Sequence, residues 1–352
     1  MQRINRIALM AIVFMLLLIN LCFGGKKEEN DLFDAIVNGN TLKTKEILEN
    51  GVKVDAINRE RNTPLMYAAF FGYDEIAKLL ISKGANVNAT DLEAATPLMF
   101  AASKGHKNIV DLLIANGAEV NRVPLKGKTA LMVASQNGHK DVVADLIYHG
   151  ADIEAIDSEG TSALLLATRK GHRDIVQLLL AKGANVNLLD NDGASSLLIA
   201  AQNGNQAIVE LLINYKANVN LGTHWVPLVQ AAQGGYEQIV GLLIAKGANV
   251  NAKTKDGFTA LRAAACNGQT KVAEILISKG ADVNVQDNAG DTPLIAAVYG
   301  PINVNVVRLL ISKGANVFLK NNKGETALKI AEFYKHNDMV QLLKSAESQE
   351  NR

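Results

Sequence analysis

The sequence predicts an all-helical solenoid built from a repeated pair of helices. Three observations support this prediction: a segment of about 33 residues recurs along the chain, each copy has apolar residues at helical spacing, and glycines end the helices at fixed positions. The clearest copy runs from Thr63 to Asn88 with the sequence TPLMYAAFFGYDEIAKLLISKGANVN. A fixed period of this length is typical of a repeat array and not of an ordinary globular domain.

The period is regular enough to define the individual copies. Positions equivalent to Thr63 follow one another at intervals of 33 residues, except for one interval of 31 and one of 34. A first copy that lacks the Thr-Pro start precedes Thr63, so we expect about ten copies over residues 31–343. The equivalent positions are Thr96, Thr129, Ser162, Ser195, Val226, Thr259, Thr292 and Thr326.

The residue types at the start of each copy predict a short first helix. Thr63 can cap this helix through its hydroxyl, and Pro64 suits the first helical position because no backbone donor is required there. Leu65 and the following Ala-Ala pair fall on one face, where the small alanines allow neighbouring helices to approach closely. Gly72 permits the positive φ that ends the helix and reverses the chain.

A second helix follows in each copy. Ile76, Leu79 and Leu80 stand at i, i+3 and i+4, which predicts one apolar face, and Gly84 ends this helix. Residues 85–88 then lead into a turn-rich connection. Each copy is therefore expected to consist of two antiparallel helices and a projecting hairpin arm.

The segments TPLMYAA, GHKNIVDLLIANGAEVN (residues 105–121) and KGANVN resemble ankyrin repeats. The resemblance covers about nine-tenths of the chain. It departs from the TPLH pattern of that family at the histidine, which is replaced by Met66, Met99, Met132 and Leu165 in four of the copies. The resemblance implies an all-α solenoid of stacked helix pairs with β-hairpin arms, and a function in binding other macromolecules through variable surface positions.

Residues 1–24 do not belong to the array and have the layout of a signal peptide or membrane anchor. Arg3 and Arg6 precede the apolar run Ile7–Leu21, and a short polar linker, residues 25–30, follows. Three fates stay open: cleavage after Gly24, lipidation of Cys22 in a weak lipobox-like context, or an uncleaved anchor. We therefore expect the repeats to be extracytoplasmic, in the periplasm, on the cell surface or secreted, with membrane contact only through this segment.

Departures from the period mark the irregular copies. Lys216 and Lys335 replace helix-ending glycines, and Asp145 occupies a leucine position at the edge of an apolar stripe, where we expect it to face solvent. Residues 344–352 are polar and are expected to form a disordered tail. The seventh copy has an arm shortened by two residues that carries His224 and Trp225, the chain's single tryptophan.

The chain lacks the motifs of an enzyme or a metalloprotein. The formal net charge is +1, and no basic face indicates binding to nucleic acid. His106, His139 and His172 recur at intervals of 33 residues, which indicates a structural role in equivalent positions. We expect no catalytic, cofactor-binding or metal-binding residue, and a monomeric chain.

The function that we predict is that of an exported, non-enzymatic scaffold that binds a partner protein on the concave face of the array. The alternative is a cell-envelope accessory that protects or tethers a specific enzyme or membrane complex, and an enzyme in its own right is a third possibility. The resemblance implies contacts from arm tips and from the two residues after each Ala-Ala pair. The candidates are Phe70, Phe71, Lys104, Gln136, Asn137, Arg169, Lys170, Gln202, Asn203, His224, Trp225, Gln233, Cys266 and Asn267.

Overall fold

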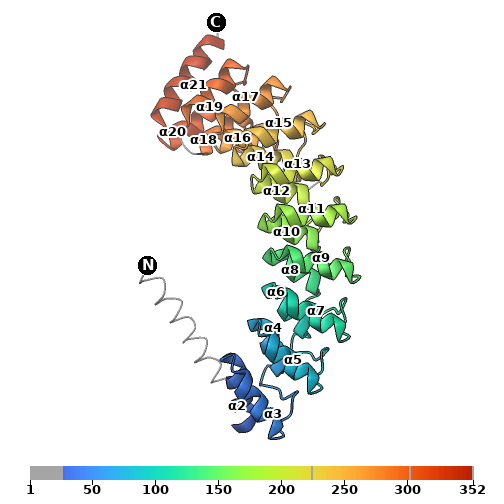
Figure 1. The fold of residues 1–352 in the computed structure, drawn as a ribbon. Coiled ribbons are helices and arrows are strands. Elements are labelled where there is room, and N and C mark those ends of the chain that lie inside the picture. The colour runs from blue at the N-terminus through green and yellow to red at the C-terminus, as the bar shows by residue number, and fades with distance from the viewer. Residues whose placement is uncertain (1–26, 223–224, 301–302, 351–352) are drawn as a thin grey trace, which may run out of the picture. The chain divides into compact units, whose positions relative to one another are not determined.

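A computed structural model of the chain describes residues 27–222, 225–300 and 303–350. These residues contain twenty helices and two isolated antiparallel bridges, but no extended strand (Figure 1). The chain divides into two compact units, one ending at Lys170 and the other beginning at Gly171. In each unit the helices stack in the order of the sequence, which confirms the predicted all-helical solenoid.

The first unit has two rows of helices, and each helix packs against the next one in its own row. We call them the first-helix row and the second-helix row, after the position of each helix within its copy. The first-helix row consists of α2 (Lys27–Val37), α4 (Pro64–Phe71), α6 (Pro97–Lys104), α8 (Ala130–Asn137) and α10 (Ala163–Lys170). The second-helix row consists of α3 (Thr41–Glu49), α5 (Asp74–Ser82), α7 (Lys107–Ala115) and α9 (Lys140–Tyr148).

The second unit repeats this arrangement. Its first-helix row consists of α12 (Ser196–Gln202), α14 (Pro227–Gly234), α16 (Ala260–Cys266), α18 (Pro293–Tyr299) and α20 (Ala327–Phe333). Its second-helix row consists of α11 (Arg173–Ala181), α13 (Gln206–Asn214), α15 (Glu237–Ala245), α17 (Thr270–Ser278), α19 (Val304–Ser312) and α21 (Asn337–Glu350).

The predicted helix signals are confirmed in the clearest copy. The Thr63 side chain accepts a hydrogen bond from the Met66 amide, Pro64 begins α4, and Gly72 follows it with φ of 79°. Ala68 and Ala69 are completely buried, because α4 packs through this face against α2 and α6. The alanine pair thus sets how closely the first helices approach one another.

The recurring histidines join neighbouring copies. The His106 ring Nε2 lies 3.1 Å from the Phe70 carbonyl, and the ring covers Gly72, where an added Cβ would approach it to 2.4 Å. His139 repeats the arrangement with its Nε2 3.0 Å from the Ser103 carbonyl. The structural role predicted for these two histidines is confirmed. It also explains why the preceding copy has a glycine, Gly72 or Gly105, at the position that the histidine ring covers.

Asparagine side chains hold successive arms together. Asn88 donates to the Gly117 carbonyl (2.9 Å) and accepts from the Glu119 amide (2.9 Å). Asn121 makes the equivalent two bonds to Gly150 and Asp152. Since both ends of each amide are used, these asparagines fix the register of one arm on the next.

The arms are hairpin turns and not paired strands. In the fifth copy, the Asp157 amide donates to the Thr161 carbonyl (3.1 Å), and one isolated bridge joins Ile156 to Ser162. Neighbouring arms also contact one another, as in the bond from the Leu125 amide to the Glu93 carbonyl (3.0 Å). The predicted hairpin arms are therefore present, with strand pairing reduced to single bridges.

The irregular positions behave largely as predicted. Lys216 and Lys335 adopt φ of 67° and 57° in place of glycine, which costs about 1–2 kcal/mol each. Asp145 lies at the half-exposed edge of α9, and its carboxylate is 2.6 Å from the Lys107 ammonium. Lys107 donates hydrogen bonds to the carboxylates of Asp111 and Asp145, and these bonds raise the pKa of its ammonium group. Asp145 is therefore paired and not an isolated buried charge.

Two predicted boundaries are wrong. Residues 344–352 were expected to be disordered, but α21 continues to Glu350 because Met339, Leu343 and Ala346 extend one buried stripe. Residues 25–30 were expected to be a linker, but α2 already begins at Lys27. The signal or anchor segment expected for residues 1–24, including Cys22, lies outside the described residues.

Leu112 and Leu113 provide a matched test of the packing on α7. Leu113 is fully buried, whereas Leu112 lies at the half-exposed edge of the same helix. Replacing Leu113 with Ala should lower the free energy of unfolding by about 2–5 kcal/mol, and Leu112→Ala should cost less. Urea titration followed by circular dichroism measures both. A larger loss for Leu112→Ala would contradict the register of α7.

Candidate partner-binding surface

The end of each first helix presents two side chains outside the packed face. Because the Ala-Ala pair faces the neighbouring helices, the next two residues turn away from that contact. In the first unit these positions hold Phe70 and Phe71 on α4 and Lys104 on α6, all at least partly exposed. The structure brings these three predicted residues together.

Four aromatic rings gather on α4 and α6. The ring centroids of Phe70 and Phe71 lie 5.2 Å apart with planes at 88°, and those of Phe70 and Phe100 lie 6.3 Å apart at 71°. Tyr67 lies 6.3 Å from Phe71. All four residues are partly exposed, and we call them the aromatic patch. Edge-to-face contacts of this kind add about 0.5–1.5 kcal/mol per pair beyond burial.

Surrounding residues hold the patch in place. The Asn58 amide donates to the Tyr67 hydroxyl (3.1 Å), which ties α4 to the arm before it. Tyr73 stacks on Phe71 at 5.7 Å, and the Lys104 ammonium lies 4.3 Å from the centroid of Phe70. The rings are therefore ordered before any partner arrives, which reduces the entropic cost of binding.

The other predicted residues of the first unit lie further along the row. The Asn137 amide donates to the Ser103 carbonyl (2.8 Å), and Gln136 accepts from Lys128 (3.4 Å). Arg169 and Lys170 are exposed at the end of α10. These side chains lie at the equivalent exposed positions of later first helices, but they are not part of the aromatic patch.

Sequence reasoning missed two of the four aromatic residues. Tyr67 and Phe100 occupy the position before the Ala-Ala pair, which was not considered as a contact position. The equivalent positions in the next copies hold the aliphatic residues Val133 and Leu166, so the aromatic residues at this position could have indicated a contact surface. Their contact with Phe70 and Phe71 became visible only in the folded stack.

In the second unit the predicted residues are polar. Gln202, Asn203 and Gln233 are exposed, whereas Cys266 and Asn267 are half-buried. The Asn267 side chain donates to the Ala263 carbonyl (2.9 Å) at the end of α16. No aromatic ring contact joins these five residues in the part of the chain that the structure describes.

The second unit has its own exposed aromatic residues, which sequence reasoning also missed. Phe333 is 79% exposed and Tyr334 is 51% exposed, and their rings lie 5.2 Å apart. Tyr299 contacts Tyr334 with ring centroids 6.2 Å apart. Phe333 and Tyr334 occupy the positions of Phe70 and Phe71, so alignment of the last copy would have found them.

A polar network near these rings is structural. Arg262 donates to the buried Asp287 carboxylate (2.9 Å), and Asn321 donates to Asp291 (3.0 Å) and to Tyr299 (3.4 Å). Burial raises the pKa of Asp291; the Asn321 bond opposes this rise, and the charge of Asp287 adds to it. The groups bond one another across copies, so the network holds arms onto first helices.

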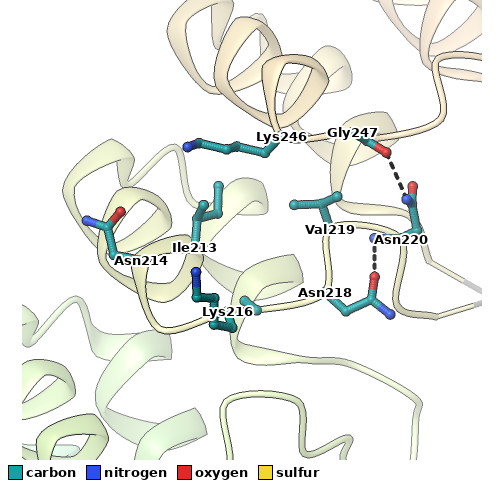
Figure 2. Close-up of a pocket in the computed structure, with 9 residues that line it drawn as sticks. Ile213, Asn214, Lys216, Asn218, Val219, Asn220, Lys246 and Gly247 are labelled. Carbon is teal, nitrogen blue, oxygen red and sulfur yellow. Dashed lines mark hydrogen bonds between the residues drawn. The ribbon is translucent and has the colours of Figure 1, made fainter.

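A polar hollow opens between the ends of α13 and α15 (Figure 2). Two of its asparagines are engaged in hydrogen bonds: Asn218 accepts from the Asn220 backbone amide (3.0 Å), and Asn220 donates to the Gly247 carbonyl (2.9 Å). Lys216 and Lys246 complete the wall without a carboxylate, histidine or thiol. The two lysines are therefore the only titratable side chains in the lining of this hollow.

The described residues contain no group of three or more His, Cys, Asp or Glu side chains that could hold a metal ion. None of the helices within those residues is both long and apolar enough to cross a bilayer.

Comparison with protein families gives matches along almost the whole chain. A family model described as "Ankyrin repeats (3 copies)" matches residues 9–91, 90–157, 146–223, 218–287 and 279–352. A search of curated proteins found no match.

Trp225 is 48% exposed at the start of the seventh copy, whereas His224 lies outside the described residues. Such exposure favours a contact over a side chain that fills the gap left by the short arm. Trp225→Ala should therefore weaken partner binding by about 2 kcal/mol or more with an unchanged melting temperature. Binding to a partner isolated by crosslinking from the native host measures the first effect, and thermal unfolding measures the second. A fall in melting temperature with binding lost only on unfolding would identify a structural plug.

Proposed function

This chain belongs to the ankyrin repeat family, and from that premise we propose that it is an exported, non-enzymatic scaffold that binds its partner on the first-helix row. Ankyrin repeats indicate a protein–protein interaction scaffold, because stacked copies present a long surface on a rigid frame. The proposal adds two statements: the partner binds on the first-helix row, and the protein acts outside the cytoplasm.

The aromatic patch is the observation that carries the choice of surface. Phe70, Phe71 and Phe100 are half-buried and pack on one another on adjacent first helices, so that part of each apolar ring faces solvent. Exposed clusters of large apolar side chains mark interaction sites, and aromatic residues are enriched among those that dominate binding energy.

Export is supported by the N-terminal sequence. Arg3 and Arg6 before the apolar run Ile7–Leu21 match the charge and length of a secretory signal. The second candidate function, a cell-envelope accessory that tethers or protects an enzyme or membrane complex, is favoured by Cys22, because a lipid on this residue would hold the array at a membrane.

Photocrosslinking in the native host tests the proposed surface. A benzophenone amino acid in place of Phe71 should give a crosslinked product of one defined mass. The matched control replaces Tyr148, an aromatic residue that is 84% exposed at the end of α9 in the second-helix row. The proposal fails when Tyr148 gives the same product as Phe71, or when neither position gives one.

Intact mass and fractionation test the compartment. We expect the exported protein to have lost its leader or to carry a lipid on Cys22, and Cys22→Ser should abolish membrane attachment only in the lipidated case. Full-length protein free in the cytosol would rule out export while leaving the proposed surface untouched.

A further inference from the structure

We propose that the first-helix row of the first unit binds an acidic segment of a partner protein, with the segment's large apolar side chains on the aromatic patch and its carboxylates over α6 and α10. This inference rests on the proposed function and names the chemistry of the partner. It depends on how charge is distributed between the two rows of helices.

Among the helices from α4 to α10, carboxylates lie only in the second-helix row. The first helices α4, α6, α8 and α10 contain no Asp or Glu. They contain three cations: Lys104, Arg169 and Lys170. The second helices α5, α7 and α9 carry Asp74, Glu75, Asp111, Asp141 and Asp145. The first-helix row from α4 to α10 is thus positive, although the chain as a whole is close to neutral.

The cations of the two rows also differ in their partners. On the second helices, Lys78 pairs with Glu75 at 2.8 Å, and Lys107 pairs with Asp111 at 2.8 Å. Within the described residues, Lys104 and Lys170 form no ion pair, and the Lys104 ammonium lies over the face of Phe70. Their charges are available to a partner's carboxylates.

The position of Lys104 links the two kinds of contact. Its ammonium lies 4.3 Å from the centroid of Phe70, so a carboxylate that reaches Lys104 stands next to the aromatic patch. A partner segment with an acidic residue close to a large apolar one fits this arrangement. Ion pairs at the rim direct such a partner, while the buried rings supply most of the affinity.

Charge also sets the direction of the bound segment. On the opposite side of the patch, α2 carries Asp31 and Asp34. Burial raises the pKa of Asp34, and the charge of Asp31 adds to the effect. The row therefore changes from negative on α2, through the aromatic patch, to positive on α6 and α10, and the acidic part of the segment lies toward α10.

Single-stranded nucleic acid also uses aromatic rings and cations, but the patch suits it less. Stacking of bases requires open ring faces. Here Lys104 covers one face of Phe70, and Tyr73 covers one face of Phe71. Phe70 meets Phe71 and Phe100 edge to face, which favours the insertion of branched or aromatic side chains between rings.

A displayed library of random 12-residue peptides, selected on the full chain, tests the proposal without a known partner. Selected peptides should be enriched in Asp and Glu next to Phe, Trp or Leu. Phe70→Ala should weaken these peptides about tenfold or more. Lys104→Gln and Lys170→Gln should each weaken them about twofold to fivefold, and an increase in salt should weaken them further.

Lys78→Gln, which removes an exposed cation of the second-helix row, is the matched control and should leave binding unchanged. Unchanged melting temperatures show that each variant is folded. The proposal is overturned when no peptide is enriched, when enriched peptides are neutral or basic, or when a thymidine oligonucleotide binds more tightly than the peptides in a Phe70-dependent manner. Neutral or basic peptides that still require Phe70 would overturn the partner chemistry alone and leave the proposed surface in place.

Discussion

The close approach of neighbouring first helices is the constraint on which the array depends. Ala68 and Ala69 on α4, and Ala101 and Ala102 on α6, are completely buried, because a single copy has no core of its own and buries its helices only against its neighbours. The first position of the pair is alanine in every copy, whereas the second varies. Ser135, Thr168 and Val298 occupy the second position in three copies and are buried there, and among the described residues the hydroxyls of Ser135 and Thr168 have no hydrogen-bond partner.

The same constraint creates the proposed binding surface. Once the alanine pair is fixed against the neighbouring helix, the next two side chains must protrude, and their identity has little effect on packing. Glycine and histidine join one copy to the next, as where the His106 ring covers Gly72 and its Nε2 lies next to the Phe70 carbonyl. The result is a strip of variable side chains on a frame held by backbone contacts, which suits recognition of a partner with little rearrangement.

Charged side chains are distributed unequally between this strip and the second helices. On the second helices, Asp111 and Asp145 both pair with Lys107, whereas Lys104 on α6 lies over the ring of Phe70. The polar groups of the second unit serve another purpose. Arg262, Asp287 and Asn321 bond across copies and hold arms in place, so similar residue types stabilise the array there.

The sequence by itself determined the period, the helix pair and the caps, because these depend on spacing within one copy. It also predicted the positive φ of Lys216, since that residue occupies a glycine position. The tertiary structure alone decided which side chains of different copies meet. Tyr67 and Phe100 contact Phe70 and Phe71 because α4 and α6 stack on one another. The last helix extends to Glu350 because Leu343 and Ala346 are buried against the rest of the array. Contacts between copies depend on how one helix is placed on the next, and no spacing within a copy contains that information.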